Sequence, residues 1–459
     1  MSLDNVSNAV MRESRYRAGV SQVPEYPCVP RPLLYGFLFY TLFLYLQGGV
    51  RFPMLGEIRF EMLMGLVLGP TALTLFLHRK DKDTGNVVSW SIALLIIMLV
   101  MVLLSRYVGH SWDVMWNRTI KFSIFGLCIA SFITSPKDLR WFLGAFLLAF
   151  LKMGHEGFMG TLDGSLIWYN QEIPRLHGAT PNYMHPNSFS GTQLGTLPYL
   201  YYFFPLLPWY GQAILAIQSI LCGNVILRTG SRTGYLALIV AVSAIVWLSK
   251  KRLKSVFVIC ALLLIAAPFI SDDYLGRFES IFEDESAAGE DTSIGQRKEI
   301  LNDAIDVFLR YPWGIGVGAF PLVRTELFGR FQDTHNLYLE VLTNIGVQGA
   351  VIFAGFLLCI WKVLRGIQRD AAQQLEKLAK IDNADPSVSS HTNDLKFLLA
   401  AAKATWVFLI IRLALGGFGM DLYEVYWWFL AGVTIAMLRI SNVARAKTGQ
   451  FVIANEARG

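Results

Sequence analysis

The chain has 459 residues, of which 54% are apolar and only 16% are charged, and its mean hydropathy is +0.44. This composition excludes a soluble globular protein and predicts an integral membrane protein. The formal net charge of +6 is what the cytoplasmic loops of such a protein require, and it indicates no nucleic-acid partner.

Apolar stretches of about twenty residues, enough to cross a hydrocarbon core of ~30 Å, recur along the whole sequence. They are continuous and lack the alternation of apolar and polar residues that is typical of a membrane β-barrel, so we expect an all-α membrane protein. About twelve transmembrane helices are expected. They lie near residues 32–50, 60–78, 87–105, 119–134, 138–154, 187–206, 209–227, 233–249, 253–270, 336–361, 397–418 and 424–440.

Lysine and arginine gather in every second loop, which places both termini in the cytoplasm because positively charged loops stay on that side. No cleavable signal peptide is expected, since the first thirty residues contain no apolar core. The five cysteines lack CxxC spacing, which argues against a disulfide framework and a zinc site. The expected divisions are a cytoplasmic tail at 1–31, transmembrane helices one to nine at 32–270, a large outside loop with an amphipathic helix at 271–334, transmembrane helices ten to twelve at 335–440 with a cytoplasmic loop at 362–396, and a cytoplasmic tail at 441–459.

The first outside segment of interest runs from residue 155 to 186 and is rich in Gly, Pro and Asn, so we expect it to be irregular. It leads into the next span through His185, Pro186 and Asn187. An ordinary polar helix start with Asn187 near the cap is the favoured interpretation of each residue alone. His185 is nevertheless a candidate for substrate binding.

The second segment, LRTGSRTGYLAL, places Arg228 and Arg232 in a short turn between two spans. Glycine on either side lets the backbone approach a ligand closely. Arginines that snorkel to the membrane surface are the structural alternative. Two arginines with Ser231 between them favour an anion site.

The third segment is the large loop, in which Ser293 and Gln296 form a capping box and Pro312 ends the helix that follows. A helix of about four turns is predicted. A helical wheel puts Leu301, Ala304, Ile305 and Phe308 on one face, which we expect to lie against the membrane domain, and Glu299, Asn302, Asp303, Asp306 and Arg310 on the other.

Arg297 lies on the apolar stripe of the same wheel and is therefore expected to point inward. An arginine in the first turn of a helix gains nothing from the helix dipole, so it needs an anionic partner. That partner is either a ligand or one of the loop acids Glu283, Asp284 and Glu285.

The loop ends in FQDTHNLYLEVL, where a polar cluster runs directly into a span. With Asp333 or Thr334 as the cap, His335 falls in the first helical turn, where the positive end of the dipole lowers its pKa. A neutral histidine at the outer surface is a competent general base or hydrogen-bond acceptor.

The order of motifs is SRTG at a span junction, then Arg297 followed by YPWGIGVGAF, then HNLYLEVL with two further glycines. This order resembles the O-antigen ligase and polymerase superfamily over about residues 178–358. The resemblance implies a GT-C-like glycosyltransferase that acts on undecaprenyl-diphosphate-linked glycans at the periplasmic face of the bacterial inner membrane. Ligases of this family transfer the glycan to the lipid A core, whereas polymerases extend it repeat by repeat.

The resemblance implies roles for individual residues. The family's essential loop histidine falls on His335, and its essential arginines fall on Arg232 and Arg297. Asn336 and Tyr338 would orient the base or the sugar. In the eleventh span, Arg412 lies close enough to the outer face to join the phosphate site.

The implied chemistry fits these residue types. Arginine stabilises a diphosphate leaving group without a metal, and the outside motifs contain no Asp-x-Asp pair. His335 would take the proton of the acceptor hydroxyl as it attacks C1, with inversion. The expected partners are the lipid-linked donor, a lipid A core or glycan acceptor, and membrane lipid, with no metal and no cofactor.

A polysaccharide flippase or transporter is the alternative from another class. Transporters usually show internal repeats or charges near the middle of the bilayer. No repeat is visible, and the notable charges gather at one surface, apart from Lys403 and Arg412 in the eleventh span.

Overall fold

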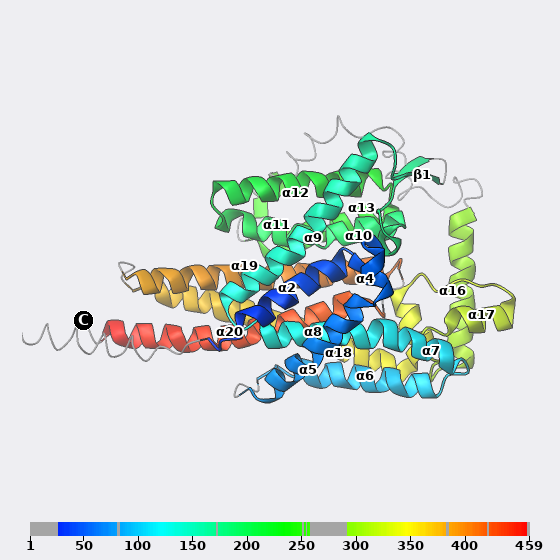
Figure 1. Cartoon of the computed structure of the whole chain (residues 1–459), viewed down its shortest axis with the longest axis horizontal. Coiled ribbons are helices and arrows are strands. Elements are labelled where there is room, and N and C mark those ends of the chain that lie inside the picture. Colours follow the sequence, from blue (N-terminus) through cyan, green and yellow to red (C-terminus); the bar gives the residue numbers. More distant parts are fainter. Residues whose placement is uncertain are drawn as a thin grey trace, which may run out of the picture.

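The computed structural model describes residues 26–79, 83–170, 173–249, 252–253, 255–257, 292–381, 385–419 and 422–456. Nearly all of the described chain is helical, and most helices lie side by side along one common direction (Figure 1). Long helices are what an apolar sequence forms in lipid, because a helix satisfies every backbone hydrogen bond within itself.

The first part of the chain forms the outer helices and a small hairpin. The helices and strands are α2 (Arg31–Tyr45), α3 (Gly48–Arg51), α4 (Pro53–Glu57), α5 (Phe60–Leu77), α6 (Val87–Leu103), α7 (Val108–Val114), the π-helix η1 (Met115–Ile120), α8 (Lys121–Phe132), α9 (Pro136–Leu162), β1 (Ile167–Asn170) and β2 (Ile173–Leu176). The strands pair antiparallel, with Ile167 opposite Leu176.

The second part contributes the centre of the bundle. Its elements are the 3-10 helix η2 (Pro181–Tyr183), α10 (Pro186–Leu194), α11 (Leu197–Phe203), the 3-10 helix η3 (Phe204–Leu206), α12 (Trp209–Arg228), α13 (Arg232–Leu248), α16 (Thr292–Arg310), α17 (Phe320–Phe328), α18 (Leu337–Leu378), α19 (Pro386–Gly416) and α20 (Val425–Glu456). The central helices are α18, α19 and α20, which pack against one another and against α6, α8, α11 and α13.

Six described helices, α5, α9, α12, α18, α19 and α20, are long and apolar enough to cross a membrane, and α6 and α13 are shorter apolar helices. The all-α membrane class is therefore confirmed, whereas the expected number of twelve spans is not. The expected span at 32–50 breaks into α2 and α3 at Leu46 and Gln47, and the one at 187–206 divides into α10 and α11. The ninth expected span, 253–270, lies almost wholly outside the described residues.

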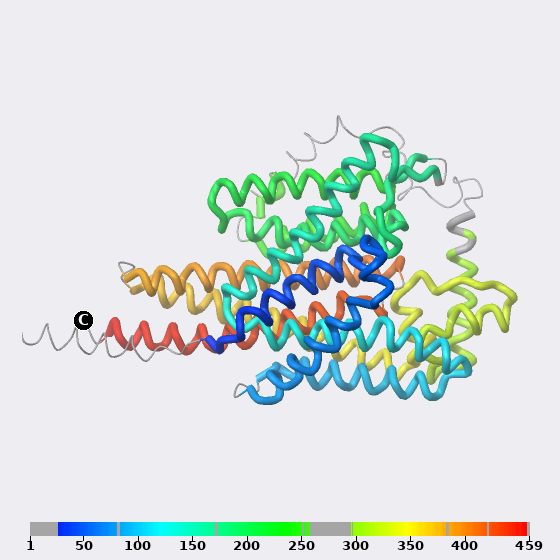
Figure 2. Tube along the Cα trace, in the orientation of Figure 1, coloured from blue at the N-terminus to red at the C-terminus, as the bar shows by residue number. Residues whose placement is uncertain are grey.

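The β-hairpin, α16 and α17 lie at one end of the bundle, the end at which α18 begins, and the C-terminal end of α20 extends at the other (Figures 1 and 2). Helix α16 stands across the ends of the long helices. The described segments that the sequence assigned to the outside thus lie at one end of the bundle.

The glycine-rich segment after α16 is fastened to a kink in α18. Gly346 has φ +70° in the middle of this helix, and a side chain there would collide with the backbone of Trp313. The backbone N–H groups of Ile315 and Gly316 donate to the carbonyls of Thr343 and Asn344, each at 3.0 Å. Gly346 therefore receives the loop backbone, where a side chain would not fit.

Candidate active site

A cavity of about 610 Å³ lies where α8, α10, α19 and α20 meet the loop before α18. Residues of α2, α3 and α5 complete its wall. Ligand sites in proteins commonly have this volume. Polar residues on its wall are Gln47, Glu61, Arg118, Lys121, Asn182, His185, Asn187, Ser188, Thr233, His335, Arg412, Glu424 and Tyr426. Of the eight residues that the sequence proposed for the site, His185, His335 and Arg412 line this cavity.

His335 lies one position before the helix rather than in its first turn. The N-cap is Asn336, whose Oδ1 accepts from the N–H groups of Tyr338 and Leu339 at 2.9 and 3.2 Å. The expectation that Asp333 or Thr334 caps the span was wrong, because Asn is an equally good cap and stands directly before the first helical residue. His335 itself has φ +47°, an uncommon conformation outside glycine.

The pKa of His335 is lowered, as the sequence suggested, but for another reason. Burial is the main cause, the charges of Arg297 and Arg324 lower the pKa further, and the carboxylate of Asp333 opposes them. The side-chain amide of Gln332 lies 3.3 Å from Nε2 of His335. The neutral imidazole is therefore the favoured form at the cavity wall, where it can accept a proton.

The second cavity histidine, His185, is the N-cap of α10, where the sequence favoured Asn187. The backbone N–H of Asn187 donates to Nδ1 of His185 at 3.2 Å. Burial lowers the pKa of His185, and the charges of Arg175, His335 and Arg297 act in the same direction. The two histidines and Arg297 therefore lie close enough to influence one another electrostatically.

Arg412 is the most deeply buried charge on the cavity wall, with 3% of its surface exposed. Its Nη2 donates to the carbonyl of Gly191 in α10 at 3.0 Å, and its guanidinium lies 3.4 Å from the centre of the Tyr426 ring. Within the described part of the chain, no carboxylate forms an ion pair with it. A buried arginine that faces a cavity without a counter-ion favours an anionic ligand.

The remaining predicted arginines lie outside the cavity lining. Arg228 ends α12, and Arg232 begins α13 after Ser231, whose hydroxyl accepts from the N–H of Gly234 at 3.0 Å. Both arginines are half-buried. Arg297 lies on α16 and is exposed, so its expected burial was wrong, although its charge reaches both histidines. The loop acids considered as its partners, residues 283–285, lie outside the described residues.

Helix α16 turns a different face inward from the one that its apolar residues suggested. Ile300, Ala304 and Val307 are buried, whereas Leu301 and Ile305 are exposed. The expected helix exists and is described from Thr292 to Arg310. The inward face also carries Asp303, and this carboxylate sets the rotation of the helix because it meets a buried arginine.

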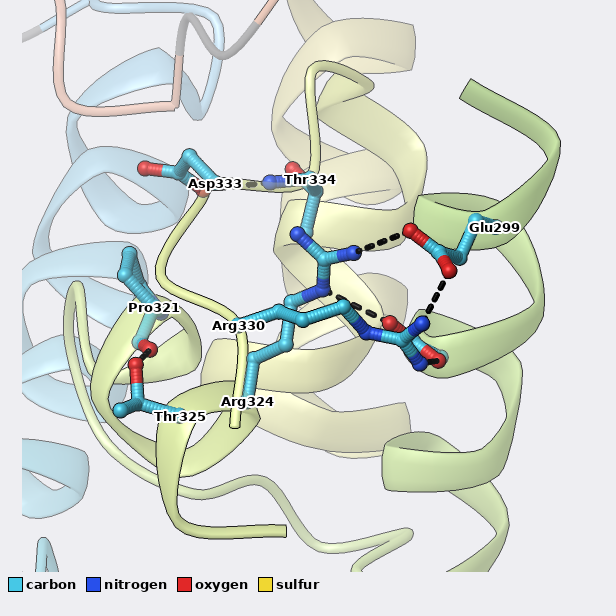
Figure 3. Close-up of polar contacts among 8 residues, drawn as sticks. Glu299, Pro321, Arg324, Thr325, Arg330, Asp333 and Thr334 are labelled. Carbon is cyan, nitrogen blue, oxygen red and sulfur yellow. Dashed lines mark hydrogen bonds and ion pairs between the residues drawn. The ribbon is translucent and has the colours of Figure 1, made fainter. Parts of the chain in front are cut away.

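That arginine is Arg324 of α17, which is 1% exposed and donates from Nε to Oδ2 of Asp303 at 2.8 Å. Arg330 donates to the same carboxylate at 3.1 Å and also pairs with Glu299, as Figure 3 shows. This charge network, defined as Glu299, Asp303, Arg324 and Arg330, joins α16, α17 and the start of the loop that carries His335. It therefore holds that loop against α16.

The two arginines of the charge network are expected to differ sharply in their contribution to stability. Arg324→Met should lower the free energy of unfolding by about 3–5 kcal/mol, because it leaves the buried carboxylate of Asp303 without its main partner. Arg330→Met is the matched control and should cost less than about 1 kcal/mol, since 40% of the Arg330 side chain is exposed. Thermal unfolding of the purified variants in detergent measures both, and equal losses would contradict this assignment.

Arg175 is a buried residue near the site that the sequence did not single out. From β2 it donates through Nε to the carbonyl of Thr229 at 2.8 Å and through Nη2 to Oδ1 of Asn187 at 3.0 Å. It thus links the SRTG turn to the start of α10. The feature of the sequence that could have identified Arg175 is its place in a Gly- and Pro-rich segment that was predicted to lie outside.

Asn336 and Tyr338 connect the start of α18 to the end of α19. Nδ2 of Asn336 donates to the carbonyl of Gly417 at 3.0 Å, and the hydroxyl of Tyr338 donates to the carbonyl of Leu413 at 2.8 Å. Neither residue lines the cavity, as far as the described residues define it. Both side chains thus hold the segment that carries His335 in place.

These features define a helical membrane protein with a cationic polar cavity at one surface of its bundle. Residues 217–354 match the family model described as O-antigen ligase, which confirms the resemblance to the O-antigen ligase and polymerase superfamily. The matched region contains Arg228, Arg232, Arg297 and His335 but ends before Arg412. No curated protein matches the chain significantly.

Proposed function

We propose that the protein is an O-antigen ligase-like glycosyltransferase of the bacterial inner membrane. It moves a glycan from undecaprenyl diphosphate to an acceptor hydroxyl, on the lipid A core or a surface polysaccharide, at the periplasmic face. The observation that carries the proposal is Arg412, a buried cation without a carboxylate partner in the described chain, on the same cavity as the half-buried His335, whose pKa burial lowers. A polymerase of the same superfamily would use the same site.

The proposed reaction needs one base and one anion site. The acceptor oxygen attacks C1 of the sugar while His335 takes its proton. The bond between C1 and the diphosphate oxygen breaks, and its electron pair leaves with the diphosphate. Arg412 stabilises the charge that develops there, as preorganised donors do in other transferases. Arg297 and Arg232, which the family resemblance favours, would contribute charge from the rim of the site.

Deleting the gene and separating the surface polysaccharides on a gel tests this proposal. Loss of all long glycan from the lipid A core supports a ligase, and caps of a single repeat support a polymerase. Unchanged lipopolysaccharide together with normal exopolysaccharide would contradict both.

A flippase or transporter is the alternative from another class. Such a protein needs charged residues along a path through the bilayer. The cationic residues on the cavity wall cluster at one surface instead, and Nζ of Lys403 makes a cation–π contact with the Tyr202 ring, 5.9 Å from its centre. Purified protein that transfers glycan in detergent, where no second compartment exists, would exclude transport as the sole activity.

The expected topology can be checked with reporter fusions. Reporters after Gly160 and after Thr292 should read periplasmic, and one near Ala379 should read cytoplasmic, because the lysine- and arginine-rich loops stay inside. Paired alkaline phosphatase and fluorescent-protein fusions give opposite signals at each site. The reverse pattern would put His335 on the wrong side of the membrane for a periplasmic donor.

Metal independence is expected because arginines, rather than a bound cation, neutralise the diphosphate in the proposed mechanism. Activity of the purified enzyme should therefore persist in excess EDTA. Transfer rates before and after chelation provide the measurement. Activity that disappears and returns with magnesium or manganese would show that a metal does this work.

A further inference from the structure

The cavity carries a histidine that the proposed reaction does not use. His335 supplies the base, yet His185 lies on the same wall. Its ring orientation is fixed by a helix cap, because Nδ1 accepts the N–H of Asn187 at 3.2 Å. A neutral imidazole that accepts at Nδ1 carries its proton on Nε2.

The Nε2–H group of His185 is available to a ligand. The residue lines the cavity and keeps solvent-accessible surface, and among the described residues no protein group is hydrogen bonded to Nε2. His185 is therefore a donor without an acceptor. It cannot act as a base at Nδ1 without giving up the cap, and the nearby positive charges oppose a second proton on the ring.

The positive charges near this donor favour an anion, and the two carboxylates on the cavity wall, Glu61 and Glu424, are paired with Lys121 and Arg118. Arg175 donates to Oδ1 of Asn187 at 3.0 Å beside it, and Arg412 donates to Gly191 in the second turn of the same helix. The N-terminus of α10 adds its own positive potential. A hydroxyl group would gain little from these charges, whereas an anionic oxygen gains from all of them.

We propose that His185 is a fixed neutral hydrogen-bond donor, and that its Nε2–H binds a phosphoryl oxygen of the lipid diphosphate in the cavity. This inference rests on the proposed function and adds a residue to its binding site. His185 and His335 then have opposite roles on one cavity: one donates a hydrogen bond throughout the reaction, and the other accepts a proton. The cap bond to Asn187 is what separates the two roles.

The closing experiment compares His185→Asn with His185→Asp. The two side chains have nearly the same shape and both are good N-caps, so α10 should fold in each variant. Only asparagine keeps a donor. Binding of undecaprenyl diphosphate to the detergent-purified full chain should weaken by about tenfold or more in His185→Asp and stay within about threefold of wild type in His185→Asn.

Aspartate also adds a negative charge, so a neutral probe completes the test. Genetically encoded Nε2-methylhistidine at position 185 removes the donor and leaves Nδ1 and the cap intact. It should weaken undecaprenyl diphosphate binding by about tenfold, with an unchanged melting temperature. Normal binding with the methylated ring, or equal binding by the asparagine and aspartate variants, would overturn the inference alone.

Two further outcomes are decisive. If the methylated protein binds undecaprenyl diphosphate normally but binds the glycan acceptor more weakly, the donor serves a sugar oxygen and the inference is wrong. If wild-type protein does not bind undecaprenyl diphosphate at all, the proposed function and the inference fail together.

Discussion

His335→Ala is expected to lower turnover by ~10²-fold or more while the Kd for undecaprenyl diphosphate stays nearly unchanged, because general-base assistance is commonly worth that much. His335 lines the cavity, and alanine removes the only group to which we assign the role of accepting the acceptor's proton. The helix cap is unaffected, since Asn336 provides it. Single-turnover transfer and lipid binding, measured on the same purified variant, separate the two quantities.

A matched control is available in Gln332, whose amide contacts the ring at 3.3 Å. Gln332→Ala removes an orienting contact and leaves the base, so its turnover should fall by much less than that of His335→Ala. If His335→Ala loses lipid binding but transfers the donor that does bind at the normal rate, His335 is a binding residue and not the general base.

The pH profile gives a second readout of the same assignment. The pKa of His335 is lowered by burial, so the acid limb of kcat/KM should lie below the ordinary histidine pKa of ~6.5. The charge of Arg297 lowers this pKa further. Arg297→Ala should therefore move the acid limb to higher pH, whereas replacing Asp333, whose carboxylate opposes burial, should move it to lower pH.

Local signals in the sequence were sufficient to predict several elements. Helix α16 occupies residues 292–310, as the apolar period and Pro312 indicated, and the described segments that the loop charges assigned to one side of the membrane lie at one end of the bundle. Such features depend on a few neighbouring residues or on the membrane as a whole. They need no knowledge of which helix packs against which.

Features that depend on distant partners were predicted less well. The buried face of α16 was assigned from its apolar residues. In the structure the helix instead buries Asp303, because the ion pair with Arg324 contributes more than the burial of Leu301 would. A buried charge without its ion-pair partner costs several kcal/mol, which is more than the free energy lost by leaving one leucine exposed. No pattern within α16 reveals a partner on α17.

The cavity was also difficult to predict, because its wall comes from distant parts of the chain. Its far wall comes from Gln47, Glu61, Arg118 and Lys121, which the sequence placed in ordinary span ends. They meet His335 only because α2 and α5 pack beside α8, which in turn packs against α20. His185 and Arg412 could be proposed from their positions at the outer surface, whereas the cap geometry that gives His185 its tautomer could not.

Removing Arg412 is expected to have the largest effect on ligand binding. Arg412→Met should weaken undecaprenyl diphosphate binding by about 10- to 100-fold and lower turnover as well, because a charge-assisted hydrogen bond is worth about 1.5–3 kcal/mol and the leaving group gains charge in the transition state. Arg412→Lys should restore binding only in part, since an ammonium cannot reproduce the planar fork that lies over Tyr426. Arg232→Ala and Arg297→Ala should weaken both quantities by less, because these residues lie outside the cavity lining.

Arg439 provides the control that separates ligand binding from packing. Arg439 is buried, as Arg412 is. It donates to the backbone carbonyl of Ala130 at 3.0 Å, and its guanidinium lies 4.6 Å from the centre of the Phe76 ring. It does not line the cavity. Arg439→Met and Arg412→Met should therefore both lower the melting temperature, but only Arg412→Met should lose affinity for the lipid diphosphate, measured at a temperature where both variants are folded. If the two variants bind the lipid equally well, Arg412 is a packing residue, and the anion site must be sought around Arg232 and Arg297.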